Sequence, residues 1–240
     1  MSHGVGMIGV RHEQRAKRIL DAAADLVLRW GYKRVTIEEV AKHAGVGKGT
    51  VYLHFATRAS LFMCVLMRDS GELVDKLVEA IRLDPAAMLP AEQARLTYLG
   101  VMRRPLLRAM FGRDIDVLGD LTHETAAEPL RTLKTTLAGE LFQLLREHGL
   151  MRTDQDIDTQ RYILTAIQTG FYLSEPLTAL PAPPEAAADA LSHTIRHALQ
   201  TPGSPDPGAL ATLAPTVLAM YEQFRDTLAR AAKGDPPHEE

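Results

Sequence analysis

The sequence lacks the features of a disulfide-stabilised or membrane-spanning protein. It has a single cysteine, Cys64, so an intramolecular disulfide is excluded and a reducing environment is expected. No stretch approaches the ~20 consecutive apolar residues that a membrane helix needs. The N-terminus also lacks the basic-then-apolar pattern of a secretion signal. We therefore expect a cytoplasmic protein without a membrane partner.

Strand-forming patterns are scarce as well, because no run of alternating β-branched residues is long enough for a strand. The composition, 46% apolar and 24% charged, is that of a folded globular protein. A chain of 240 residues can form one small and one medium domain. The sequence thus predicts an all-α fold.

The net charge of −3 combines two parts of opposite sign. Residues 1–66 contain ten Lys and Arg against five Asp and Glu, a net charge of +5. The remaining residues contain seventeen against twenty-five, a net charge of −8. A basic N-terminal part on an acidic body indicates that only one end of the molecule meets phosphate.

Residues 36–55, TIEEVAKHAGVGKGTVYLHF, have the pattern of two short helices joined by a glycine turn. Thr36 and Glu39 have the spacing of a capping box. Gly45 stands where the first helix ends in a left-handed turn. The apolar residues at helical spacing are Ile37, Val40, Ala41 and Ala44 in the first helix, and Val46, Val51 and Phe55 in the second. Such a pair is a helix-turn-helix, whose second helix enters the DNA major groove.

The exposed residues of this motif suit contact with DNA. Lys48 offers charge to phosphate, Gly49 allows close approach of the backbone, and His54 offers a ring nitrogen. The predicted DNA-binding residues are Thr36, Lys48, Gly49, Thr50, Tyr52, His54 and Arg58. The motif taken by itself leaves open a solvated face on an ordinary helical hairpin.

A wider pattern favours the DNA-binding interpretation, because residues 13–66 resemble the DNA-binding domain of the TetR/AcrR family of transcriptional repressors. The matching residues are Ile19, Ala22, Ala23, Leu26, Gly31, Tyr32, Val35, Thr36, Val40, Ala41, Ala44, Gly45, Val46, Lys48, Gly49, Thr50, Tyr52, His54, Phe55, Leu61 and Phe62. Two places depart from the family pattern. Gly47 replaces the usual capping Ser, and residues 56–60 lack the usual Lys and acidic residues, although Arg58 keeps a cation.

The resemblance implies a homodimer that binds a palindromic operator through an N-terminal three-helix helix-turn-helix domain. It also implies a helical C-terminal body for ligand binding and dimerisation, with repression released by a small-molecule effector. The expected domains are a disordered arm at 1–10, the DNA-binding domain at 11–57, the helical ligand-binding and dimerisation domain at 58–200, a linker at 201–208, an extra C-terminal helix at 209–232 and a disordered tail at 233–240. The sequence leaves open whether the extra helix covers the core, extends the dimer interface or sits apart.

Within the body we expect helices at about 58–83, 91–103, 105–111, 125–149, 155–175, 185–200 and 207–232. Aromatic, Met and polar residues predict an apolar effector pocket with a few orienting groups. Its predicted residues are Tyr98, Met102, Phe111, His123, Phe142, Thr165, Gln168, Phe171 and Tyr172. The helices at 155–175 and 185–200 are the expected dimer pair, the latter through Ala186, Ala190, Leu191, Ile195 and Ala198.

Motifs of catalysis and metal binding are absent or incomplete. The run at 45–50 is no P-loop, because its glycine and hydroxyl positions do not match. His193 and His197 share a helix face, but spacing identifies no third metal ligand. No catalytic residue, metal or cofactor is therefore predicted. Two alternatives stay open: a helical enzyme with an incidental head, and an architectural or activator DNA-binding protein without a small-molecule effector.

Overall fold

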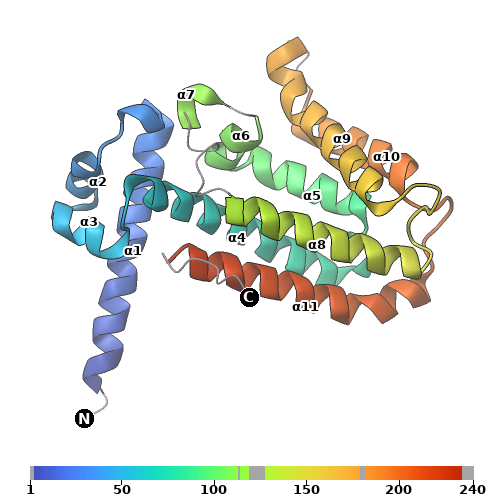
Figure 1. Ribbon diagram of the computed structural model, residues 1–240, viewed down its shortest axis with the longest axis horizontal. Helices are drawn as coiled ribbons and strands as arrows, with labels where there is room; N and C mark the ends of the chain where they lie inside the picture. The colour runs from blue at the N-terminus through green and yellow to red at the C-terminus, as the bar shows by residue number, and fades with distance from the viewer. Residues whose placement is uncertain (1–2, 113, 119–127, 179–181, 234–240) are drawn as a thin grey trace.

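The computed structural model describes residues 3–112, 114–118, 128–178 and 182–233. Its elements in those ranges are all helices, which confirms the predicted fold class. The one extended pairing among them is an isolated bridge between Met151 and Gln200. Figure 1 shows a small head formed by the first three α-helices, and a larger helical body beside it. Helix α4 runs from the head into the body.

The head contains the predicted helix-turn-helix. Its elements are α1 (His3–Trp30), η1 (Tyr32–Arg34), α2 (Ile37–Ala44) and α3 (Lys48–His54). The capping box is present: the Glu39 N–H donates to Thr36 Oγ1 at 3.3 Å, and the Thr36 N–H donates to the Glu39 carboxylate at 2.8 Å. Gly45 has a φ of 66°, in the left-handed region. Gly47 precedes α3 without a side-chain cap, as the missing Ser predicts.

The disordered arm expected at 1–10 is wrong for residues 3–10. Helix α1 already begins at His3, and its first turns project away from the head (Figure 1). A helix that has been nucleated gains one hydrogen bond for each residue added. That gain lets the glycines of this segment join α1 in spite of their low helix propensity.

The body contains the remaining elements. They are α4 (Arg58–Leu83), η2 (Pro85–Met88), α5 (Pro90–Met102), α6 (Pro105–Phe111), α7 (Ile115–Leu118), α8 (Glu128–Glu147), α9 (Ile157–Thr178), α10 (Pro184–Leu199) and α11 (Pro207–Ala231). The elements missed by sequence reasoning, η2 and α7, are four residues each, too short to show a helical period. Prolines start α5, α6, α10 and α11. Proline lacks a backbone N–H, and at the first helical position that group would have no hydrogen-bond partner within the helix.

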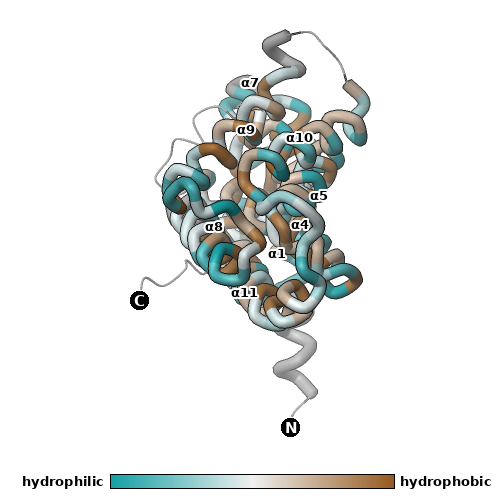
Figure 2. Tube along the Cα trace, turned by 90° about the vertical axis from the view of Figure 1, so that its right-hand side faces the viewer, coloured by the Kyte–Doolittle hydropathy of each residue, from teal (hydrophilic) through white to brown (hydrophobic). Residues whose placement is uncertain are grey.

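Helix α4 lies at the centre of the body, with α5 and α11 packed against it and α10 packed on α5. Gly100 allows the close approach of α5 and α4, since a Cβ there would clash with Leu73 Cδ1. Both views place α9 and α10 along the upper edge of the body and α11 along its lower edge (Figures 1 and 2). The central helix is thus covered on several sides.

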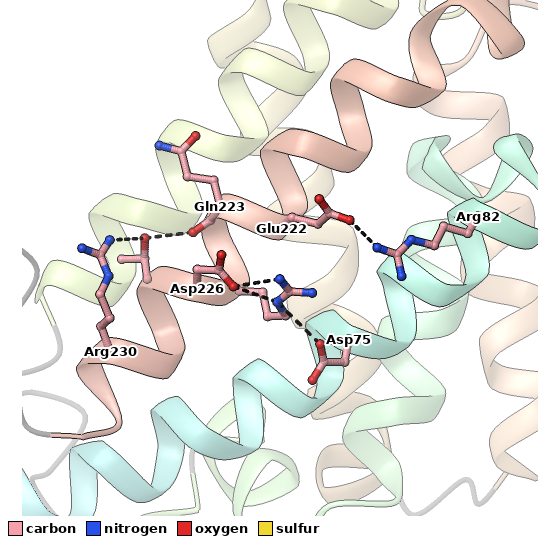
Figure 3. Close-up of polar contacts among 8 residues, drawn as sticks. Asp75, Arg82, Glu222, Gln223, Asp226 and Arg230 are labelled. Carbon is pink, nitrogen blue, oxygen red and sulfur yellow. Dashed lines mark hydrogen bonds and ion pairs between the residues drawn. The ribbon is translucent and has the colours of Figure 1, made fainter. Parts of the chain in front are cut away.

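Helix α11 covers the core of the body, which answers the question that the sequence left open. Its buried residues are Leu210, Leu213, Val217, Tyr221, Phe224 and Leu228. Two exposed ion pairs flank its contact with α4: Arg82 donates to Glu222, and Arg225 lies 3.8 Å from Asp75 (Figure 3). Residues 201–206 therefore connect two packed helices of the same body, and α11 is no separate appendage. Residues 234–240, within the predicted tail, lie outside the described residues.

No single helix in the described part of the chain is long and apolar enough to cross a membrane. Helices α3 and α4, which meet at 61°, satisfy that test as a bent pair, by length and composition alone.

Candidate DNA-binding surface and effector cavity

Helix α3 presents most of the predicted DNA-binding residues on an open surface. Lys48, Gly49 and Tyr52 are exposed, and the Tyr52 side chain is 46% accessible. Leu53 is 83% exposed on the same helix. Sequence reasoning missed this leucine because an apolar residue is normally assigned to the core. An exposed aliphatic side chain on such a helix can contact thymine methyl groups.

Lys48 is paired with a carboxylate from the preceding helix. Its ammonium donates to Glu38 of α2, and it lies 5.9 Å from the centroid of the Tyr52 ring. The pairing lowers the pKa of Glu38 and raises the pKa of Lys48. Lys48 is therefore charged at neutral pH, and a DNA phosphate that binds it competes with Glu38.

His54 lies at the end of α3 against α1. Its ring centroid is 4.0 Å from that of His12, a contact that the sequence does not reveal. Burial, followed by the charges of His12 and Arg15, lowers the pKa of His54. His54 is thus neutral at pH 7 and offers a hydrogen bond instead of a charge.

Arg58, one of the predicted DNA-binding residues, makes contacts within the protein. The half-buried side chain donates to the backbone carbonyls of Tyr32 at 2.8 Å and Val35 at 3.2 Å. Its guanidinium also lies 4.0 Å from the centroid of the Tyr32 ring. Arg58 therefore fastens the start of α4 to the segment before α2, because its Nη1 donates to two protein carbonyls. Thr36 is likewise committed to capping α2 through its hydroxyl.

A cavity of about 220 Å³ lies in the body between α4, α5, α8, α9 and α11. Its lining residues are Ser70, Leu73, Val74, Leu77, Pro90, Gln93, Ala94, Thr97, Phe111, Lys134, Leu137, Ala138, Leu141, Phe142, Leu164, Gln168, Tyr221 and Phe224. Most of them are apolar, as in ordinary small-molecule sites. Three predicted ligand residues, Phe111, Phe142 and Gln168, are among them.

The other predicted ligand residues that the structure describes lie outside this cavity. Tyr172 packs on Tyr98, with ring centroids 5.3 Å apart, and on Phe111 at 4.7 Å, so these rings fill the space between α5, α6 and α9. Thr165 lines an adjoining surface groove. Met102 and Phe171 are partly buried against the core, and His123 lies outside the described residues.

The cavity contains polar groups that sequence reasoning missed. Lys134 of α8 is half-buried, and its Nζ lies 5.2 Å from the centroid of the Phe111 ring. Burial lowers the pKa of Lys134 to about 8. Tyr221 of α11 donates to the Gln93 carbonyl, and burial raises the pKa of this tyrosine. Only the tertiary structure brings these residues together, because they come from three helices far apart in the sequence.

Comparison with known proteins identifies the family of the N-terminal domain. The model of bacterial regulatory proteins of the tetR family matches residues 19–63, which include the whole helix-turn-helix. Residues 19–63 therefore have the sequence of a tetR-family DNA-binding domain. This confirms the predicted resemblance of the N-terminal domain.

Relatives of this chain include the transcriptional repressor KstR of Mycolicibacterium smegmatis. It is 31% identical over 121 residues, which cover 46% of this chain and 57% of KstR. The chain spans about a third of the length of the first curated relatives that it matches.

Two solved structures share the fold at low sequence identity. NalD of Pseudomonas aeruginosa, the secondary repressor of the MexAB-OprM multidrug efflux pump, has a TM-score of 0.59 and 19% identity; the match covers 80% of this chain and 98% of NalD. FadR of Bacillus subtilis, in complex with stearoyl-CoA, has a TM-score of 0.59 and 16% identity. The match covers 75% of this chain and 96% of FadR.

Substituting Lys48 and Arg58 is expected to have different consequences for this protein. Lys48→Ala removes one phosphate contact, so the slope of log affinity against log salt should fall by about one unit while stability is kept. Arg58→Ala leaves two carbonyls without their donor, so the unfolding free energy should fall by about 1–3 kcal/mol. Urea unfolding and DNA titration at several salt concentrations measure the two effects. A flatter salt slope for Arg58→Ala at unchanged stability would contradict the structural role.

Lys134→Met is expected to stabilise the ligand-free protein. Burial disfavours the ammonium. The resulting loss of stability is present in full below the folded pKa of about 8 and vanishes above the ordinary lysine pKa of 10.5. At pH 7 the variant should gain up to about 3 kcal/mol. Between pH 7 and 9 the native protein should recover about 1 kcal/mol relative to the variant. Chemical unfolding of both proteins at the two pH values checks this, and a pH-independent difference would refute it.

Proposed function

We propose that the protein is a homodimeric, sequence-specific DNA-binding repressor that leaves a palindromic operator when a small, largely apolar molecule enters the body cavity. The main support for this proposal is that α4 contacts both the head and the cavity. Its first turns hold the head through Arg58 and through the Tyr32–Phe62 ring contact at 5.2 Å. Its middle lines the cavity through Ser70, Leu73, Val74 and Leu77.

A ligand that displaces α4 would therefore displace the head. Arg68 of α4 adds a link, since it donates to Asp21 of α1 at 2.6 Å. Release requires that the ligand bind the non-DNA-competent conformer more tightly. A ligand at a hundred times its dissociation constant for that conformer supplies about 2.7 kcal/mol. The cavity favours this sensor over the alternative of an architectural protein with a solid body.

Exposed small residues support dimerisation through α9 and α10. Along α9, Ala166 and Gly170 are exposed, and Tyr162 is 74% exposed. On α10, Ala186 and Ala190 are exposed. Such faces allow two helices of a symmetric pair to approach closely.

Part of the dimer face that was expected on α10 packs within the monomer instead. Leu191 and Ile195 are fully buried within the monomer, where α10 packs on α5. Their assignment to the dimer face is therefore wrong. We propose that α9 and the exposed alanines of α10 form the interface, which would place the two α3 helices in major grooves about 34–36 Å apart.

The test is a DNA-binding selection with purified protein at fixed salt, read by sequencing. We expect enrichment of an inverted repeat whose half-site centres lie about one helical turn apart. Lys48→Ala, carried through the same selection, is the control for binding through the head. Enrichment of single half-sites, or of no sequence by a folded protein, would refute the dimeric operator binder. A reporter gene behind the selected operator then separates repression from activation by the sign of the response.

A further inference from the structure

Two residues that line the cavity, Ser70 and Gln93, carry polar atoms without a hydrogen-bond partner. Ser70 Oγ and Gln93 Nε2 are buried, and neither has a hydrogen-bond partner among the described residues. The Gln93 side-chain carbonyl already accepts a hydrogen bond from the Tyr221 hydroxyl. The amide N–H groups of Gln93 therefore remain to donate to a ligand. The described lining contains no Asp or Glu. Buried polar atoms without partners are rare, and they mark a place where a further molecule completes the network.

Lys134 adds a positive charge to these donors. Its ammonium faces the Phe111 ring at 5.2 Å, among the apolar residues Leu137, Leu141 and Phe142 of the same lining. No carboxylate or carbonyl in the described ranges accepts from it. An ammonium without a counter-ion in apolar surroundings is costly, and an anion that pairs with it removes that cost.

The size of the cavity limits the ligand. Its volume of about 220 Å³ is below the range of about 300–1,000 Å³ that is typical of ligand pockets. A longer ligand would extend beyond this cavity into the adjoining groove, whose lining shares Lys134, Ala138 and Gln168 with it. The apolar walls favour a short hydrocarbon or aromatic body.

We propose that the effector is a compact carboxylate, whose anionic group pairs with Lys134 and whose short apolar body fills the space between α4, α8 and α11. Ser70 and Gln93 donate to further oxygen atoms of the ligand. This inference rests on the proposed function, because it names the class of molecule that the cavity takes.

The pairing predicts a dependence of ligand binding on pH. The other titratable groups that face Lys134 from neighbouring helices are Tyr221 of α11 and Asp158, Arg161 and Tyr162 of α9. Asp158 and Arg161 pair with each other at 2.9 Å, so neither supplies a free counter-charge. Because the carboxylate needs the charged lysine, its affinity should fall about ten-fold from pH 7 to pH 9.

The experiment measures calorimetric binding to the full-length protein with two matched pairs of probes: octanoate with 1-octanol, and 3-phenylpropionate with 3-phenylpropanol. Octylamine tests the sign of the charge. We expect each acid to bind at least about ten-fold more tightly than its alcohol, and octylamine to bind least tightly. In Lys134→Met the preference for the acid should disappear. Lys76→Met removes an exposed lysine that pairs with Glu79, and should keep the preference.

The outcomes separate this inference from the proposed function. Equal binding of acids and alcohols, no binding of either acid, or an unchanged preference in Lys134→Met overturns the carboxylate. Release of the selected operator is measured separately in a mobility-shift assay. Acids that bind through Lys134 without releasing the operator would support the anion site and refute the ligand-responsive release. Release by a neutral ligand, with no preference for acids, would support the ligand-responsive release and refute the carboxylate site.

Discussion

Gly170→Arg is expected to abolish operator binding while the monomer stays folded. Gly170 is exposed on α9, and a Cβ added there meets nothing within 4 Å. Arginine also has a higher helix propensity than glycine, so α9 itself should not be weakened. In the proposed dimer, however, a long cation would stand where α9 meets its symmetry mate. Loss of the second half-site contact should weaken operator binding by about 10²- to 10⁴-fold.

Sedimentation and DNA titration at fixed salt measure this effect. Ala211→Arg is the matched control, because it places the same side chain on an exposed position of α11. We expect the control to remain dimeric and to bind the operator normally. A dimeric Gly170→Arg protein with native affinity would show that the interface lies on another face of the body.

A chain that ends at Gln200 is expected to lose its cooperative unfolding transition. The truncation removes α11, whose Val217 and Leu228 are fully buried. It also exposes the side of α4 that contacts α11, where Leu228 Cβ is 3.8 Å from the position of a Cβ on Gly71. Each large apolar side chain lost from a core costs about 2–5 kcal/mol, and a whole domain is stable by only about 5–15 kcal/mol. The loss of several such residues should therefore exceed the stability available.

Urea unfolding, followed by circular dichroism, tests the truncation against a chain that ends at Lys233. The longer chain keeps α11 and the Lys233–Glu13 ion pair at 3.0 Å, so it should unfold like the native protein. The point variant Leu228→Ala should lie between them, with a loss of about 2–5 kcal/mol. A Gln200-terminated chain with the native unfolding midpoint would show that α11 is dispensable for the core.

The sequence by itself determined the head, because the signals there are local. The Thr36–Glu39 capping box and the left-handed Gly45 act within a few residues of their own positions, and the structure reproduces both. The starts of α5, α6, α10 and α11 could be read for the same reason, since a proline restricts the backbone wherever it stands. Charge composition, which needs no coordinates, already separated the basic head from the acidic body.

The tertiary structure alone decided which side chains meet. Arg58 looks like a free cation in the sequence, but it is directed to carbonyls that lie 23 and 26 residues earlier in the chain. Helix α11 could have packed anywhere until its contact with α4 was known. Lys134, Gln93 and Ser70 carry no mutual spacing that marks a site. Their meeting depends on how α4, α5 and α8 pack, and that packing is a property of the whole core.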